Sequence, residues 1–227
     1  MPSFIWERDI MAISNYKNFQ PCLMALAITL ATVIVSLGAA ISGANAEVKI
    51  REYAAPKDLV NFKLQDGAGK PFGNAQLKGK WTLVLMGFTH CPAICPFTLQ
   101  NMAAVKQELS TKVSPARLPR VVFIGVDPDR DLENIGEYVK HFDDEFIGVS
   151  GKWNEIKKVV ESMDGFVRIV GKDKNPESYD VRHGATVNLL DPEGRLVVGI
   201  YPPLEPKSAA LFIAQTMLKH ARRTQTN

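Results

Sequence analysis

The run Trp-Thr-Leu-Val-Leu-Met-Gly-Phe, residues 81–88, constrains the fold most, because it spans eight residues without a charge. A strand of this kind is usually buried on both faces, so its sheet needs covering elements on each side. A second apolar run follows at 120–126 and a shorter third one at 146–150. These runs predict three buried strands in one sheet.

Apolar residues at helical spacing follow each of these strands. The first predicted helix begins near Pro96, which suits the first helical position because its missing amide proton costs nothing there. Two further stripes run over 132–142 and 156–163, and a last helix is expected over about 206–222. Strands that alternate with helices predict an α/β fold with parallel central strands.

Turn residues mark two antiparallel pairs. Phe62 and Leu64 alternate with polar residues before Asp66-Gly67, which indicates a hairpin. Residues 185–201 form two strand-like runs around an Asp-Pro-Glu-Gly turn, whereas residues 171–180 are polar and are expected to be a surface loop. The sheet is therefore predicted to be mixed, with flanking helices.

An uncharged stretch of 19 residues, 23–41, precedes this domain. A membrane-spanning helix needs about 20 such residues and a signal-peptide core about 7–15, so the length favours a retained membrane-spanning helix. Ala44-Asn45-Ala46 resembles a cleavage site and keeps a removed signal open. The expected organisation is a cytoplasmic segment (1–22), a membrane anchor or signal segment (23–46), a linker (47–60) and a folded domain (61–227). The resemblance described below classes this domain as thioredoxin-like.

Charge helps to limit the location and the partners. The net charge of +3 is small and the basic residues are spread along the chain, so no nucleic-acid partner is expected. The leader is neither Arg-rich nor free of acidic residues, which fits a mitochondrial transit peptide poorly. We expect a single-pass protein of a bacterial inner membrane, with its soluble domain in the periplasm.

Cys91 and Cys95 end the first apolar run and are separated by three residues. A cysteine at a helix N-terminus has a lowered pKa, and the resulting thiolate is both a nucleophile and a metal ligand. A redox couple, a metal clamp and a structural disulfide therefore remain open. Two thiolates and an imidazole suit a soft ion such as Cu(I), whereas structural zinc takes four protein ligands.

The chain has four histidines. His90 neighbours Cys91, but adjacent side chains leaving a strand point to opposite faces, so packing is the simpler interpretation. His141 falls on the polar side of a helix, and His220 is expected to be a solvated helix residue near the C-terminal end. His183 lies between the polar loop and the late hairpin, where a loop histidine is more often a surface residue than a ligand.

Three motifs change that interpretation. LKGKWTLVLMGFTHCPAICPFTL, VDPDRD and YDVRHGATVNLLDPEGRL together resemble the Sco/SenC family of copper chaperones for cytochrome c oxidase assembly. The resemblance covers about residue 62 to the last helix, and it implies a thioredoxin-like fold behind a single N-terminal span. It also implies a copper ion, Cu+ or Cu2+, on Cys91, Cys95 and His183.

The implied activity is metal delivery rather than enzymatic turnover. The implied partner is the copper-site subunit of cytochrome c oxidase, and an upstream copper donor and a thioredoxin-type reductant are further candidates. Asp127 ends a central strand and is expected at the edge of the site, as a supporting or docking group. Asp129 and Asp131 are as well explained by the turn and the helix entry that the motif forms.

A thiol–disulfide oxidoreductase that reduces cysteines of a partner is the main alternative. It needs the same cysteine pair and no histidine. Thioredoxins usually place a cis-proline just before the terminal hairpin, and Arg-His-Gly-Ala-Thr (182–186) has no proline there. A peroxiredoxin would need a proline upstream of Thr89. A structural disulfide leaves His183 unexplained.

Overall fold

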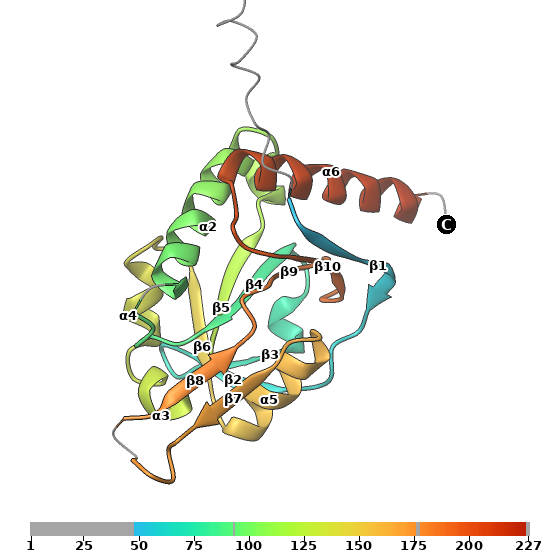
Figure 1. Ribbon diagram of the computed structural model, residues 1–227. Helices are drawn as coiled ribbons and strands as arrows, with labels where there is room; N and C mark the ends of the chain where they lie inside the picture. The colour runs from blue at the N-terminus through green and yellow to red at the C-terminus, as the bar shows by residue number, and fades with distance from the viewer. Residues whose placement is uncertain (1–47, 93, 176–177, 226–227) are drawn as a thin grey trace, which may run out of the picture. The chain divides into compact units, whose positions relative to one another are not determined.

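An eight-stranded mixed sheet forms the centre of the domain (Figure 1). The computed structural model describes residues 48–92, 94–175 and 178–225. The strand order is β1-β10-β9-β4-β5-β6-β2-β3. Its parallel part consists of β4 (Thr82–Gly87), β5 (Arg120–Gly125) and β6 (Ile147–Ser150). These are the three apolar runs of the sequence, so the prediction of buried strands is confirmed.

Antiparallel strands extend the sheet on both sides of this parallel part. β9 (Val187–Leu190) and β10 (Leu196–Ile200) form the predicted late hairpin, and β9 pairs with β4. β2 (Lys63–Asp66) and β3 (Pro71–Gly73) form the predicted early hairpin, and β2 pairs with β6. The α/β fold with a mixed sheet and flanking helices is therefore confirmed.

The expected linker over 47–60 is wrong for most of its length. Strand β1 (Ile50–Lys57) occupies this segment and pairs with β10 at the edge of the sheet. Most of its side chains are exposed, so no apolar alternation marks it in the sequence. Backbone pairing holds it instead, and the Tyr201 N–H donates to the Lys49 carbonyl at 2.9 Å. The compact unit accordingly includes β1 and does not begin at residue 61.

Helices cover both faces of the sheet. α2 (Ile94–Ser110) and α6 (Pro206–Gln225) pack against one face, and α5 (Trp153–Ser162) packs against the other. Successive β4 side chains alternate between the two apolar cores, which explains why this strand is apolar throughout. The shorter helices are α3 (Pro128–Asp131), α4 (Ile135–Lys140), η1 (Asn74–Leu77) and η2 (Pro115–Arg117).

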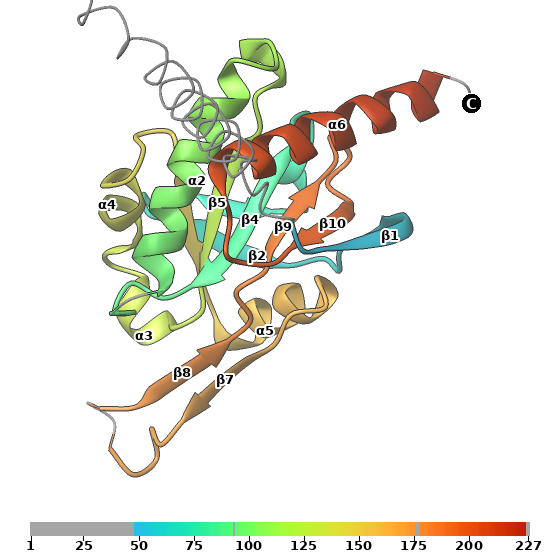
Figure 2. The same ribbon diagram turned by 45° about the horizontal axis from the view of Figure 1, so that its top comes forward.

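A second, two-stranded sheet projects from the domain (Figure 2). It consists of β7 (Val167–Val170) and β8 (Asp180–His183), paired antiparallel. The sequence predicted the polar turn between them but neither strand. Val181 is buried in the same core as α5, which fixes the inner end of the hairpin to the domain. His183 is the last residue of β8, so this hairpin decides where the histidine lies.

The expected cytoplasmic segment (1–22) and membrane anchor or signal segment (23–46) lie outside the described residues. Within the described part of the chain, no helix combines the length and the apolar character needed to cross a membrane.

Candidate metal centre

The two cysteines lie where β4 ends and α2 begins, at the carboxyl edge of the parallel strands. This is the position predicted from the sequence. Cys91 precedes the helix and is partly exposed, whereas Cys95 lies in its first turn with 4% of its surface exposed. The structure holds both residues as thiols. The Cys95 N–H donates to Cys91 Sγ at 3.5 Å, so the first turn of the helix brings the two residues together.

A glycine at the end of β4 makes room for the Cys95 sulfur. A Cβ atom on Gly87 would lie 2.8 Å from Cys95 Sγ and 2.7 Å from the Phe123 ring. Real Cβ atoms do not approach other atoms so closely, so any larger residue would displace the sulfur or the ring. The glycine therefore allows Cys95 to pack directly against the strand.

His183 reaches this cysteine from the second sheet. Its Nε2 atom lies 3.8 Å from Cys95 Sγ, although 88 residues separate the two in sequence. Its Nδ1 atom lies 2.8 Å from the Gly184 carbonyl oxygen. Because a carbonyl can only accept, Nδ1 carries the proton and Nε2 presents a lone pair towards the sulfur. Burial lowers the pKa of His183, which favours this neutral form.

A small cavity lies between Cys95 and His183. Its volume is ≈10 Å³, and its wall is completed by Leu85, Met86, Ile94, Thr98 and Ala185. About 10–15 Å³ is needed to hold one water molecule, so this space suits a single ion and excludes an organic ligand. A sulfur and an unprotonated imidazole nitrogen at the same cavity form a donor set that suits a soft metal ion.

The expected lowering of the cysteine pKa is wrong for Cys95. Burial raises the pKa of this thiol, and the hydrogen bond from the Phe88 backbone opposes the rise only in part. The sequence predicts the helix N-terminus but not the depth at which Cys95 is buried. The Cys95 thiol consequently keeps its proton until a cation compensates the thiolate charge.

Asp131 supports the loop before the cysteines. Its buried carboxylate accepts the Thr89 N–H at 2.7 Å, the Thr89 hydroxyl at 2.9 Å and the Asp127 N–H at 2.8 Å. The turn thus holds the cysteine loop against the end of β5. The sequence explains Asp131 as part of a turn and a helix entry, and the one further signal is a carboxylate a few residues after a buried strand.

Asp127 lies beside the site rather than in it, as expected. Its buried carboxylate accepts the Tyr179 hydroxyl at 2.8 Å and pairs with Arg130. The Arg130 guanidinium lies over the Tyr179 ring, 4.0 Å from its centre, and 5.7 Å from the centre of Phe88. Since Tyr179 directly precedes β8, these contacts attach the histidine-bearing hairpin to the domain.

Comparisons with known proteins identify the family of the chain. The family model described as SCO1/SenC matches residues 52–219. The chain belongs to the SCO1/SenC family. An SCO2-like protein of Rickettsia felis is 35% identical over 154 residues, which cover 67% of this chain and 74% of that protein.

Solved SCO structures share the fold. The crystal structure of Arabidopsis thaliana ScoI with copper bound is 32% identical and superimposes with a TM-score of 0.64, covering 70% of this chain and 98% of that one. BsSco, a member of the Sco family of cytochrome c oxidase assembly proteins with an identified disulfide switch, is 20% identical at a TM-score of 0.57, covering 74% and 96%. At that identity the second likeness shows the fold alone.

The donor atoms of this SCO1/SenC site are not all in mutual contact. Within the described ranges, one group of His, Cys, Asp or Glu side chains has all its ligand atoms within 4.8 Å of one another, and it consists of Asp191, Glu193 and His220. The assignment of Cys91, Cys95 and His183 as copper ligands therefore stays a prediction. The structure supports the approach of His183 to Cys95 and of Cys91 to the Cys95 backbone.

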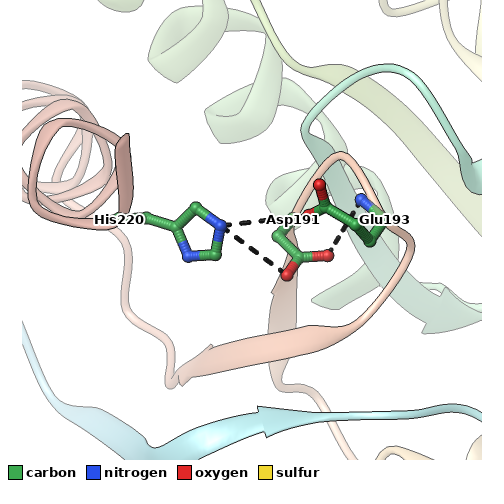
Figure 3. A group of neighbouring side chains, drawn as sticks. All are labelled: Asp191, Glu193 and His220. Carbon is green, nitrogen blue, oxygen red and sulfur yellow. Dashed lines mark hydrogen bonds and ion pairs between the residues drawn. The ribbon is translucent and has the colours of Figure 1, made fainter. Parts of the chain in front are cut away.

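The group formed by Asp191, Glu193 and His220, which Figure 3 shows, does not suit a metal ion. Asp191 is buried, and Arg195 already contacts its Oδ2 atom through two nitrogens at 2.8 Å. A cation at this carboxylate would have to displace or oppose the guanidinium. His220 lies 3.8 Å from Asp191, and its ring meets Trp81 edge-on at 5.1 Å. The expectation of a solvated His220 is therefore wrong, because this side of α6 packs on the sheet.

The remaining two histidines are surface residues. His90 is exposed and its Nδ1 atom lies 3.0 Å from the Thr89 hydroxyl oxygen, while His141 is exposed beside Phe142. His141 agrees with its expected place on the polar side of a helix, whereas the packing role expected for His90 is wrong, because its side chain is exposed.

Proposed function

We propose that this SCO1/SenC protein is a copper metallochaperone that carries one ion on Cys91, Cys95 and His183. It delivers the ion to the copper site of a respiratory cytochrome c oxidase subunit. It works in the periplasm, anchored to a bacterial inner membrane by residues 23–41. The contact of 3.8 Å between His183 Nε2 and Cys95 Sγ carries the proposal, because it joins two distant motifs at a cavity the size of one ion.

The chemistry of these side chains suits reversible binding. Two sulfurs and one imidazole match the preference of Cu(I) for soft ligands. Because burial raises the pKa of Cys95, copper binding must release the thiol proton. Three protein ligands leave a coordination position open, so a thiolate or imidazole of the partner can enter while one protein ligand leaves. Delivery then needs no chemical turnover.

Copper stoichiometry tests the proposal. The reduced chain is loaded with Cu(I), unbound metal is removed, and bound copper is counted for the wild type, Cys95→Ser and His183→Ala. We expect one ion per wild-type chain, none for Cys95→Ser, and an affinity lower by roughly tenfold or more for His183→Ala. Cys22→Ser and His141→Ala serve as matched controls that keep the ion. A wild-type chain that binds no copper, or a His183→Ala chain of unchanged affinity, would contradict the proposal.

The thiol–disulfide oxidoreductase remains a second candidate. The approach of the Cys95 N–H to Cys91 Sγ at 3.5 Å favours it, since it brings the two cysteines close enough for a redox pair to be considered. The raised pKa of Cys95 opposes it, because thiol exchange needs a thiolate. Rapid insulin reduction by the copper-free chain, together with no copper binding, would favour the oxidoreductase.

A further inference from the structure

The last helix, α6, presents two large apolar side chains to solvent. Leu211 and Leu218 have exposed fractions of 51% and 50%. They are seven residues apart, which is close to two helical turns, so they lie on the same side of the helix. The opposite side, which carries Ile213, packs in the core. Neither leucine belongs to an apolar core of the described domain, so packing within the domain does not explain them.

Basic residues accompany these leucines. The exposed basic residues of α6 are Lys207, Lys219, Arg222 and Arg223. Lys207 lies four residues before Leu211, and Arg222 lies four residues after Leu218, so both extend the line of the leucines along the helix. We call these four residues the outer stripe of α6. The helix contains no Asp or Glu, so the stripe is apolar at its centre and positive at both ends.

The carboxylates around α6 lie off this stripe. Glu205 precedes the helix and accepts two N–H groups of its first turn, at 2.7 and 3.1 Å. Glu193 lies 3.9 Å from His220, on the side of α6 that packs on the sheet. Glu52, in β1, lines a small cavity with Lys219. The outer stripe therefore keeps a positive character, which is complementary to an anionic surface.

The described chain begins on the same side of the domain. Val48 packs against the core that α6 covers, and β1 begins next to α6 in both views (Figures 1 and 2). The proposed membrane span ends at residue 41, so the connection to Val48 covers at most about 25 Å when fully extended. A helix of 20 residues is about 30 Å long, so this connection is shorter than α6 itself. Such a short tether keeps α6 close to the membrane.

We propose that α6 lies on the surface of an anionic membrane through its outer stripe. Leu211 and Leu218 enter the boundary between headgroups and acyl chains, and the basic residues lie beside the lipid phosphates. The anchor at residues 23–41 rests on the proposed function. The anchor and α6 together attach the domain at two places. The copper site is thereby held in a restricted orientation towards a partner in the same membrane.

The depth of a spin label tests this proposal. The full-length chain is placed, one copy per disc, in nanodiscs of phosphatidylcholine with or without phosphatidylglycerol. Cys22, Cys91 and Cys95 are replaced by serine, and one nitroxide is attached through Leu218→Cys or, as a control of similar exposure, Phe166→Cys. In the anionic discs we expect the label at residue 218 to lie about 5–10 Å below the phosphate level and the label at residue 166 to stay in water.

Charge variants separate lipid recognition from confinement by the anchor. The spectrum of the label at residue 218 distinguishes docked from free helices. Lys207→Gln combined with Lys219→Gln should lower the docked-to-free ratio roughly 10- to 30-fold in the anionic discs. Lys157→Gln combined with Lys158→Gln removes the same charge from α5, on the other face of the sheet, and should leave the ratio unchanged. Salt at about 0.5 M should release the helix as well, because it screens the attraction.

Three results would overturn the proposal. The first is a label at residue 218 that stays in water in the anionic discs. The second is equal docking in neutral and anionic discs, which would indicate confinement by the anchor. The third is burial that needs two chains per disc, which would indicate a contact between copies. Retention of the doubly substituted α6 variant on the discs at high salt measures the anchor separately, and copper is counted on the chain with its native cysteines. Failure of the proposed function is therefore distinguishable from failure of α6 docking.

Discussion

At the scale of single residues, buried polar groups position the cysteine loop. Asp131 accepts three hydrogen bonds from Thr89 and Asp127 and is fully buried. Burial nevertheless raises its pKa to about 6 from the ordinary 3.8. A carboxyl whose pKa is higher in the folded state stabilises the fold fully below about pH 4, and this contribution is lost as the pH rises through 6.

Asp131→Asn should remove this pH dependence. We expect the free energy of unfolding of the wild type to fall, relative to the variant, by about 2 kcal/mol between pH 4 and pH 7. Urea unfolding of both proteins at four pH values measures the difference. The asparagine also loses hydrogen bonds, but that loss is the same at each pH, so the slope isolates the titration. Parallel curves for the two proteins would show that Asp131 does not titrate in this range.

At the scale of elements, the sequence predicts the buried strands and fails at the half-exposed ones. β4 and β5 are apolar throughout because both faces are covered, and this pattern is visible without a structure. β7 and β8 have four residues each. Partly buried and exposed positions alternate along β7, and in β8 Val181 is buried between exposed neighbours. Val167 and Ile169 carried a weak alternating signal, and the nearby polar loop obscured it. The hairpin that places His183 was therefore missed, although the histidine itself was identified from the family resemblance.

Tyr179→Phe should loosen this hairpin. The change removes the hydroxyl that donates to the buried Asp127 carboxylate and leaves an acceptor unpaired, at a cost of about 1–2 kcal/mol. Amide hydrogen exchange of residues 180–183 should become roughly 5- to 30-fold faster, and copper affinity should fall because His183 is less well placed. Tyr138→Phe is the matched control, since the buried Tyr138 hydroxyl has no partner among the described residues. Exchange rates equal to the wild type in both variants would rule out the Tyr179 contact as the hairpin's attachment.

At the scale of the whole molecule, the site depends on contacts between distant parts of the chain. The cysteine loop was predictable, because a strand followed directly by a helix places it at the edge of the sheet. The 3.8 Å approach of His183 to Cys95 was not, because no local pattern encodes a contact across 88 residues. The edge strand β1 was hidden for a similar reason: its exposed side chains say nothing of its backbone pairing with β10.

The true start of the domain can be tested by truncation. A chain that begins at residue 61 lacks β1, so the β10 edge loses its pairing and the Asp164 carboxylate loses Tyr53 and Lys57. We expect the free energy of unfolding to fall by roughly 2–4 kcal/mol, because several backbone hydrogen bonds are lost at about 1 kcal/mol each. The uncovered edge should also promote association, since an unpaired strand is a template for another chain. A chain that begins at residue 47 keeps β1 and is the control. Urea unfolding and size-exclusion chromatography compare the two, and equal stability with equal elution would show that the domain begins after β1.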